Sequence, residues 1–559
     1  MSKQKENLVI LLLIFIISVF LVFDLFVNVG RSANMDGLVH ITTIAQFTDA
    51  FKSGDFPVVW LDGFANYGLP IGMFAQPASI YLGMLINLFV NDPVLAFNIV
   101  GFIAILLSNI FYYYFLRLYF KPLYAFLGTL LFCFAPFRII DLYIRGAIPE
   151  TFSTIFLPLT LISIYHLVQK KKLSAFFFLV LSLTGIVFTH PMTLVTYSFI
   201  FIPYFLFNLI QVFGFKITRQ SLQYLGLFIL AIILAVGLVG YYVIPLNLEI
   251  KYVYYGSQQS YLVDNQFMGF ASYFDPNWYY FYKDDVFPRG HFIQSGLLET
   301  IGMLLGVGIV LFRLFTGKVK KQLTILDFAV ITCLVIVFMT TQYSDILYQK
   351  IHILGNIQFP WRMSSALIFI PPIIITYIMQ KLNKNFLVIL LIALVCFLRY
   401  PQLYGKNYTL YPLNSYTFTP LNLHSNNMNT IWTGETEFYP IKKDKIEIIE
   451  GDGKILEKTV KNSSRHYVLD AKTELKVADY TFYFPGWHVY VDGAESPIQF
   501  QDPNYRGVIT YAVPSGKHDV LVRFEDTKVR LLGKAVSAVF IVLLGVLFIF
   551  RKKGKRFLT

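Results

Sequence analysis

The sequence has little charge and few cysteines. Only 14% of its 559 residues are Asp, Glu, Lys or Arg, whereas 56% are hydrophobic, and the mean hydropathy is +0.59. Because a soluble enzyme needs a far more charged surface, this composition excludes one and indicates a polytopic membrane protein. The cysteines, Cys133, Cys333 and Cys396, all lie in or beside apolar runs. The sequence therefore predicts neither a disulfide framework nor a cysteine zinc site.

The net charge of +13 comes from basic residues in short clusters between the apolar runs. The clusters are Lys170 to Lys172, Lys216 with Arg219, Lys318 to Lys321, Lys381 with Lys384, and Arg551 to Arg556. Basic loops that flank spanning helices are typically cytoplasmic. The large polar region from about Pro401 to Arg530 is roughly charge-balanced. The sequence therefore predicts no basic groove for a nucleic acid.

Apolar windows of about 17 to 25 residues predict about twelve spanning helices. They lie near residues 8–29, 93–117, 122–140, 151–168, 173–190, 191–211, 222–246, 296–315, 323–341, 362–380, 385–400 and 532–550. Lys3 and Lys5 favour a cytoplasmic amino terminus. From that start, the predicted order of spans puts every basic cluster on the cytoplasmic side of the membrane. The apolar piece Ile80 to Val90 is too short to span. We expect it to form a helix along the outer interface.

The predicted organisation is a multi-span region over residues 1–400, whose outer loop at 31–93 carries interfacial helices, followed by three further segments. These are an extended outer linker at 401–440, an extracytoplasmic domain at 441–530, and a final transmembrane helix with a basic cytoplasmic tail at 531–559. The domain contains alternating runs such as HYVLD and HDVLVRF, separated by turns such as Asp452-Gly453 and Asp492-Gly493. This pattern predicts a small β-sandwich inserted before the last span.

Seven segments on the expected outer face together resemble one family. They are DGLVH (36–40), GDFPVVW (54–60), NYGLPIGMFAQP (66–77), FAPFRIIDLYIRGAIPE (134–150), THP (189–191), IQFPWR (357–362) and FPGWHVYVDG (484–493). The set resembles the bacterial membrane proteins called 6-pyruvoyl-tetrahydropterin synthase-related, which are similar to GT-C glycosyltransferases, and the resemblance covers nearly the whole chain. The synthase in that name is a small soluble zinc enzyme, and this sequence has no clustered histidine triad for such a metal.

The resemblance implies a GT-C-like fold and transfer of a sugar from a polyprenyl-phosphate carrier at the outer leaflet. It also implies an acidic residue of the first outer loop as the base, and the matching residue here is Asp36. His40 lies one helical turn further on, and we predict that both are catalytic. The alternative for Asp36 is that it caps the following helix. His40 could orient Asp36, bind a phosphate oxygen or help to hold a cation, and the alternative is an interfacial histidine without a partner.

Arg138, Arg145 and Arg362 lie on the expected outer side, against the positive-inside tendency, at the ends of predicted spans. Sugar transfer from a lipid phosphate needs cationic groups to stabilise the departing phosphate, and guanidinium groups bind phosphate oxygens in a bidentate way. We therefore predict that these arginines bind the donor phosphate. The alternatives are snorkelling, or structural ion pairs such as Arg145 with Glu150 or Arg138 with Asp141.

Glu150, His190 and His291 are the predicted contacts to the acceptor or substrate. Glu150 opens a predicted span, where the helix dipole stabilises a carboxylate, and it could equally bind an acceptor hydroxyl or a metal. His190 stands before Pro191 in a tight outer turn, so a structural role is an alternative for it, and His291 in FPRGH is equally ambiguous. No local spacing predicts a metal site. A divalent cation such as Mg²⁺ or Mn²⁺ stays open as a cofactor.

The leading hypothesis is a glycosyltransferase of the cell membrane that moves a sugar from a polyprenyl-phosphate carrier to an extracytoplasmic glycan, glycolipid or protein. In this hypothesis both chain termini are cytoplasmic, the β-domain is outside, and the partners are lipids and envelope acceptors. The first rival is a lipid or glycolipid flippase, since many spans with polar groups also describe a transporter. The second rival is a non-catalytic membrane protein that binds envelope glycan.

Overall fold

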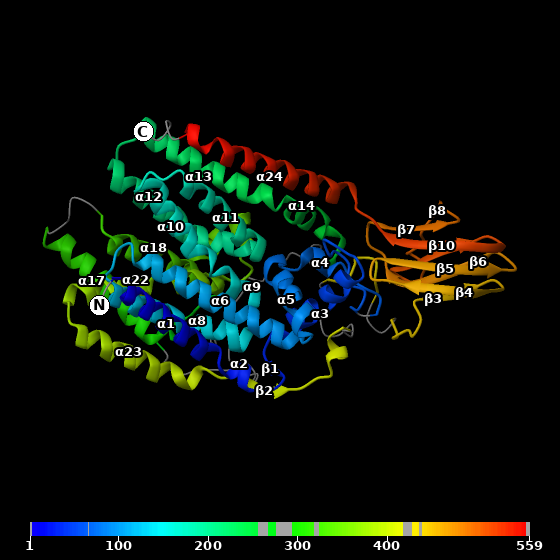
Figure 1. Cartoon of the computed structure of the whole chain (residues 1–559), viewed down its shortest axis with the longest axis horizontal. Coiled ribbons are helices and arrows are strands. Elements are labelled where there is room, and N and C mark those ends of the chain that lie inside the picture. The colour runs from blue at the N-terminus through cyan, green and yellow to red at the C-terminus, as the bar shows by residue number, and fades with distance from the viewer. Residues whose placement is uncertain are drawn as a thin grey trace.

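The computed structural model of the chain describes residues 3–64, 66–254, 266–274, 293–317, 323–417, 428–434 and 439–554. A long bundle of helices carries a strand-rich domain at one end (Figure 1). The first helix begins, and the last helix ends, at the opposite end of the bundle (Figure 1). We call the two ends of the bundle the β-domain end and the terminal end.

The helices differ widely in length. The long helices and the segments that continue them are α1 (Lys3–Val22), α6 (Pro93–Leu116), α7 (Pro122–Cys133), α8 (Pro136–Ile139), the π-helical turn η1 (Ile140–Arg145), α9 (Ile148–Ser153), α10 (Phe156–Val168), α11 (Ser174–Thr189), α12 (Pro191–Phe213), α13 (Arg219–Leu238), α14 (Gly240–Glu249), α17 (Leu297–Phe315), α18 (Ile325–Thr340), the 3-10 turn η4 (Pro360–Met363), α21 (Ser364–Leu367), α22 (Pro371–Leu382), α23 (Asn385–Arg399) and α24 (Lys528–Gly554). The other helices are α2 (Asp24–Val27), α3 (Gly37–Lys52), α4 (Ile71–Phe74), α5 (Pro77–Val90), α16 (Ala271–Phe274), α19 (Asp345–Lys350) and α20 (His352–Gly355).

Within the described residues, nine helices are long and apolar enough to cross a membrane, and the number rises to eleven if each of two bent pairs is one span. One pair, Pro122–Cys133 with Pro136–Arg145, bends by 48°, and the other, Ile325–Thr340 with Gln342–Lys350, bends by 84°. The predicted class, a polytopic α-helical membrane protein, is confirmed. The predicted span near 173–190 is α11, whose 16 residues make it about 24 Å long. The helix α5, which contains Ile80 to Val90, has 14 residues.

Local sequence signals determine where several helices begin. Asp92 is the N-cap of α6, and its carboxylate accepts hydrogen bonds from the backbone N–H of Val94 (2.9 Å) and Leu95 (3.1 Å). Thr218 and Thr324 form capping boxes at the starts of α13 and α18. Proline occupies the first turn of α5, α6, α7 and α12, where its missing N–H removes no helical hydrogen bond.

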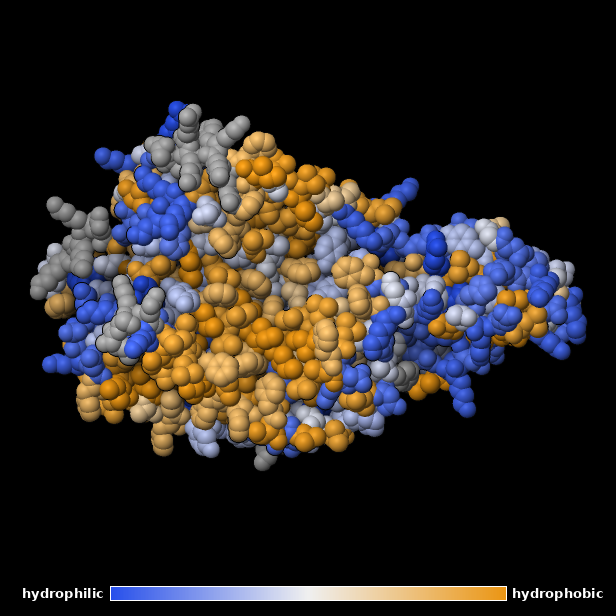
Figure 2. Space-filling view, viewed as in Figure 1, coloured by the Kyte–Doolittle hydropathy of each residue, from blue (hydrophilic) through white to orange (hydrophobic). Residues whose placement is uncertain are grey.

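The surface of the bundle is hydrophobic along its length. Figure 2 shows a broad apolar area over the helices, with hydrophilic residues gathered at the terminal end and over the β-domain. Large side chains such as Phe178, Ile233 and Leu305 are 64%, 52% and 54% exposed on this surface. Exposed apolar area of this extent needs a lipid environment.

The β-domain contains two antiparallel sheets. The strands are β3 (Ile446–Glu450), β4 (Gly453–Val460), β5 (Ser464–Ala471), β6 (Leu475–Phe482), β7 (Trp487–Val491), β8 (Ala494–Ser496), β9 (Val508–Val513) and β10 (Gly516–Phe524). One sheet has the order β4-β5-β10-β7-β8 and the other β3-β6-β9. Residues of both sheets, such as Leu469 and Val477, share one buried cluster. The predicted β-sheet region before a final apolar helix is therefore confirmed.

The β-domain packs on the loop between α3 and α5. The rings of Trp60 in the loop and Trp487 in β7 lie edge to face at 5.3 Å. Asp62 in the same loop is ion-paired with the fully buried Arg465 and, at 2.9 Å, with Lys445. A single hydrophobic cluster runs from α3 and α5 through this loop into both sheets. The loop and the β-domain therefore share one core.

The segment after α23 returns to the start of the chain. Its strand β2 (Lys406–Thr409) pairs with β1 (Arg31–Ala33), just after α2. The Asp24 carboxylate accepts hydrogen bonds from the Gly405 N–H and the Tyr408 hydroxyl, both at 2.7 Å. This pairing fixes the region that precedes α3.

Candidate active site at the β-domain end

Asp36 stands at the N-cap position of α3, but its side chain makes no capping hydrogen bond. The Gly37 N–H instead donates to Asn34 Oδ1 at 2.9 Å. His40 follows in the first turn of α3, where its N–H donates to the Asp36 carbonyl at 3.2 Å. Asp36 and His40 are both half-buried. Capping therefore does not occupy the Asp36 carboxylate.

The backbone connects Asp36 directly to Arg145. The Asp36 N–H donates to the Arg145 carbonyl oxygen at 2.6 Å. The next residue, Gly146, has φ +65°, and a Cβ built there would lie 2.7 Å from Asn34 Cγ and 2.8 Å from the Gly37 nitrogen. Only glycine allows both this left-handed conformation and this close approach. Asp36 also acts electrostatically on the Arg145 guanidinium.

Arg145 lies between two carboxylates. Its Nη1 atom forms an ion pair with Asp141 and a second one, at 2.7 Å, with Glu150 Oε2. The π-helical turn η1 brings Asp141 and Arg145 together, and Glu150 lies in the first turn of α9. The guanidinium carbon lies 4.9 Å from the ring centroid of Trp361. All three charged side chains are at most 5% exposed.

Arg362 approaches the same carboxylates from η4. Its guanidinium donates to Gln358 Oε1 at 2.5 Å and lies 5.2 Å from the ring centroid of Phe359. It acts electrostatically on Glu150 and on His190. Arg362 therefore adds a second guanidinium to the group around Glu150.

His190 lies in the turn between α11 and α12 and is 7% exposed. Burial lowers its pKa to about 3, and the Glu150 carboxylate opposes this shift only in part. Its Nδ1 atom has no hydrogen-bond partner within the described residues. His40 also acts electrostatically on His190. A neutral imidazole thus lies near Glu150, with one ring nitrogen available to a ligand.

We call these residues the charged cluster: Asp36, His40, Asp141, Arg145, Glu150, His190 and Arg362. The structure thereby brings together six of the eight residues predicted from the sequence and adds Asp141. The signal for Asp141 is its position four residues before Arg145, which is the spacing of a helical ion pair.

Arg138 is linked to the charged cluster through the electrostatic action of Asp141, whereas its hydrogen bonds go elsewhere. Its Nη1 donates to Asn109 Oδ1 at 3.0 Å and its Nη2 to Ser108 Oγ at 2.7 Å, while the guanidinium carbon lies 4.0 Å from the Phe132 ring centroid. It is 2% exposed and has no ion pair with a carboxylate in the described part of the chain. Its contacts belong to the packing of α6 against α7 and α8. His291 lies outside the described residues.

The charged cluster offers no ready metal site. Among the described residues, no three His, Cys, Asp or Glu side chains lie close enough together to hold a metal ion. Asp141 and Glu150 both form ion pairs with Arg145. The cluster can instead accept a proton at Asp36 and hydrogen-bond an anion through its arginines.

A family model described as 6-pyruvoyl-tetrahydropterin synthase related domain, membrane protein, matches residues 74–403. An uncharacterized protein of Lactococcus lactis subsp. cremoris (strain MG1363) is 22% identical over 287 residues, which are 50% of this chain and 46% of that protein. The chain thus matches less than half the length of this curated relative.

Two solved structures of transferases are similar to the chain at low identity. The oligosaccharyltransferase of Archaeoglobus fulgidus in its apo form has 12% identity and a TM-score of 0.41, over 73% of this chain and 57% of that one. The arabinofuranosyltransferase AftD from Mycobacteria has 11% identity and a TM-score of 0.41, over 73% of this chain and 27% of that one.

Proposed function

This chain belongs to the 6-pyruvoyl-tetrahydropterin synthase related membrane proteins, and from its charged cluster we propose that it is a membrane glycosyltransferase. In this proposal the donor is a sugar on a polyprenyl-phosphate carrier, and the acceptor is an extracytoplasmic glycan, glycolipid or protein. The observation that carries the proposal is a backbone hydrogen bond of 2.6 Å between Asp36 and Arg145. In the proposal Asp36 is the catalytic base and Arg145 is a cation that binds the donor phosphate.

The first support is the state of the Asp36 carboxylate. Asn34 has taken over the cap of α3, so the carboxylate stays available to an incoming hydroxyl. Asp36 is half-buried, in keeping with a base that substrate can reach. His40 lies one turn away on the same helix and can orient the acceptor or the carboxylate.

The second support is the supply of guanidinium donors. Arg145 donates to both carboxylates through its Nη1 atom, and within the described residues neither Nη2 nor Nε donates a hydrogen bond. Asp141 and Glu150 thus fix the plane of the guanidinium while two of its nitrogens stay available. Arg362 carries a second guanidinium close to Glu150. Such planar groups suit the oxygens of a phosphate in a zone of low dielectric.

The proposed reaction is a single displacement. Asp36 takes the proton from the acceptor hydroxyl, whose oxygen attacks the anomeric carbon of the donor sugar. The bond between that carbon and the phosphate oxygen breaks, and the polyprenyl phosphate leaves with the electron pair. Arg145 and Arg362 stabilise the charge that builds on the departing phosphate. His190, which burial keeps neutral, hydrogen-bonds a sugar hydroxyl or the acceptor.

The test is transfer from labelled polyprenyl-phosphate sugars by the full chain in proteoliposomes. We expect Asp36→Asn to lower turnover by about 100-fold or more, since general base catalysis contributes roughly that much. The matched control is Asp92→Asn, because Asp92 caps α6 and asparagine caps a helix equally well. If Asp36→Asn turns over like the wild type while Arg362→Gln also keeps its KM for the donor, the proposed site is wrong.

A flippase would give a different result in the same vesicles. It would move a labelled lipid between leaflets, and neither the wild type nor Asp36→Asn would form a new glycosidic product. A glycan-binding protein without catalysis would do neither. Measuring the product and the leaflet of the label together separates the three functions.

A further inference from the structure

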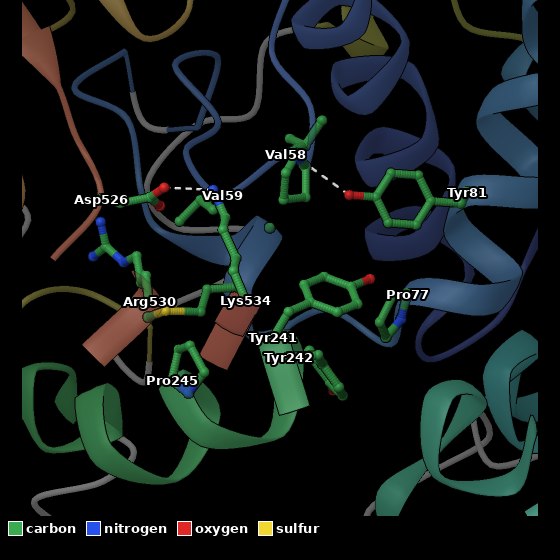
Figure 3. A pocket seen from close by; sticks show the side chains of 13 residues that line it. Val58, Val59, Pro77, Tyr81, Tyr241, Tyr242, Pro245, Asp526, Arg530 and Lys534 are labelled. Carbon is green, nitrogen blue, oxygen red and sulfur yellow. Dashed lines mark hydrogen bonds and ion pairs between the residues drawn. The ribbon is translucent and has the colours of Figure 1, made fainter. Parts of the chain in front are cut away.

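A hollow that is partly open to the surroundings lies where the β-domain joins the last helix, α24. Its walls come from the loop at Pro57 to Val59, from α4 and α5, from α14, and from Asp526 and the first turns of α24 (Figure 3). None of the residues of the charged cluster lines it. The hollow is therefore a separate feature of the described structure.

The walls of the hollow are largely apolar and aromatic. The lining side chains of this kind are Pro57, Val58, Val59, Met73, Pro77, Tyr81, Tyr241, Tyr242 and Pro245. The Val58 N–H donates to the Tyr81 hydroxyl at 3.0 Å (Figure 3). Tyrosines with an apolar ring and a polar tip suit the zone where lipid headgroups meet acyl chains.

One side of the hollow is charged. Arg530 is buried, and its guanidinium is committed to Glu249 at 2.9 Å and to the carbonyl of Pro485 at 2.7 Å. Lys534 is 41% exposed and pairs with Asp526, which is 27% exposed (Figure 3). This contact uses one of the three N–H donors of the Lys534 ammonium. Lys534 can therefore turn toward a ligand in the hollow.

The position of Lys534 along α24 indicates how deep in the membrane the hollow lies. The candidate span Lys528–Phe550 begins less than two helical turns before Lys534. An ammonium at this depth lies near the phosphates of a bilayer leaflet. The helix that carries it faces outward, since only 11% of the span is buried in the protein.

From these observations we propose that the hollow binds the headgroup of a membrane phospholipid. Lys534 holds the phosphate, which replaces Asp526 as its partner, and the tyrosine-lined wall covers the glycerol and the first methylenes. The hollow is walled by the loop that contacts the β-domain, by α14 and by α24, so the bound lipid ties these three elements to one leaflet. The proposal is independent of sugar transfer, because it uses no residue of the charged cluster.

The experiment is native mass spectrometry of the full chain in detergent, titrated with phosphatidylglycerol. We expect Lys534→Gln to weaken binding about tenfold, since a hydrogen bond to a charged group contributes about that factor, and Lys534→Arg to keep it. Asp526→Asn should strengthen binding, because the phosphate no longer competes with a carboxylate. Lys528→Gln is the matched control, because Lys528 is an exposed lysine of the same helix that does not line the hollow.

Other ligands distinguish the sources of the phosphate. Soluble glycerol phosphate and a neutral glycolipid should both bind at least tenfold more weakly than phosphatidylglycerol. If glycerol phosphate displaces the lipid, the site takes a free phosphate and the lipid proposal is wrong. Equal binding of the neutral glycolipid, or weaker binding by Asp526→Asn, also overturns it. Thermal unfolding of each variant shows whether a loss of binding reflects a loss of fold.

Discussion

Removing the Arg145 side chain is the most direct perturbation of the charged cluster. Arg145→Met keeps most of the volume but leaves Asp141 and Glu150, which are 5% and 2% exposed, without their cation. Breaking a buried ion pair typically costs about 3 to 5 kcal/mol, because a charge stays buried without a partner. Because both ion pairs of Arg145 are lost at once, we expect the free energy of unfolding to decrease by an amount in the upper part of that range.

The same reasoning predicts a rescue. Combining Arg145→Met with Asp141→Asn and Glu150→Gln removes the buried charges altogether, and replacing a complete buried ion pair by neutral groups is often close to neutral. We therefore expect the triple variant to be more stable than Arg145→Met alone. A non-additive result of this kind measures the coupling between the three residues.

The assay is unfolding of the purified protein in mixed micelles by increasing fractions of a denaturing detergent. The control is Arg313→Met, because Arg313 is 18% exposed and pairs with Asp327 at 3.0 Å, so its loss should be smaller. The reasoning fails if Arg145→Met costs no more than Arg313→Met, or if the triple variant is less stable than the single one. Either result would mean that the carboxylates are neutral or hydrated in the folded protein.

Two further substitutions test the surroundings of Asp36, each with a matched control. Gly146→Ala should lower both thermal stability and transfer, because an added Cβ meets Asn34 at 2.7 Å. The control is Gly493→Ala, since Gly493 also has a positive φ, +81°, but nothing lies within 4 Å of the added Cβ. It should show only the backbone strain of roughly 1 to 3 kcal/mol. Asp62→Ala should expose the β-domain to protease, because it leaves the buried Arg465 without its closest carboxylate. Asp444→Ala removes an exposed ion pair and should leave the cleavage rate unchanged.

Hydropathy and charge pattern predicted the helical part of the fold well. The continuous apolar windows near 93–117 and 191–211 correspond to α6 and α12, because a helix in lipid must satisfy its own backbone and stay apolar along its whole length. The bends after Cys133 and Thr340 could not be predicted in this way. Hydropathy averages over a window and does not report where a helix breaks.

The arginines show why the charged cluster was only partly predictable. Arg145 lies seven positions after Arg138, and in a regular α-helix that spacing puts both side chains on one face. The chain between them instead widens into the π-helical turn η1, so the two side chains face different neighbours. Arg138 contacts α6, whereas Arg145 faces α9. Such a change of phase depends on tertiary packing, which a sequence pattern does not contain.

The β-domain also bears on the charged cluster, although none of its residues belongs to it. It packs on the loop that follows α3, and α3 begins next to Asp36. Asn462 of the β-domain accepts a hydrogen bond from the Asp62 N–H at 2.9 Å and donates to the Trp60 carbonyl at 2.8 Å. These contacts hold the loop that follows α3, while the pairing of β1 with β2 holds the chain that precedes α3. The segment that carries the proposed base is thus clamped at both ends, as a base that must meet its substrate in a fixed geometry requires.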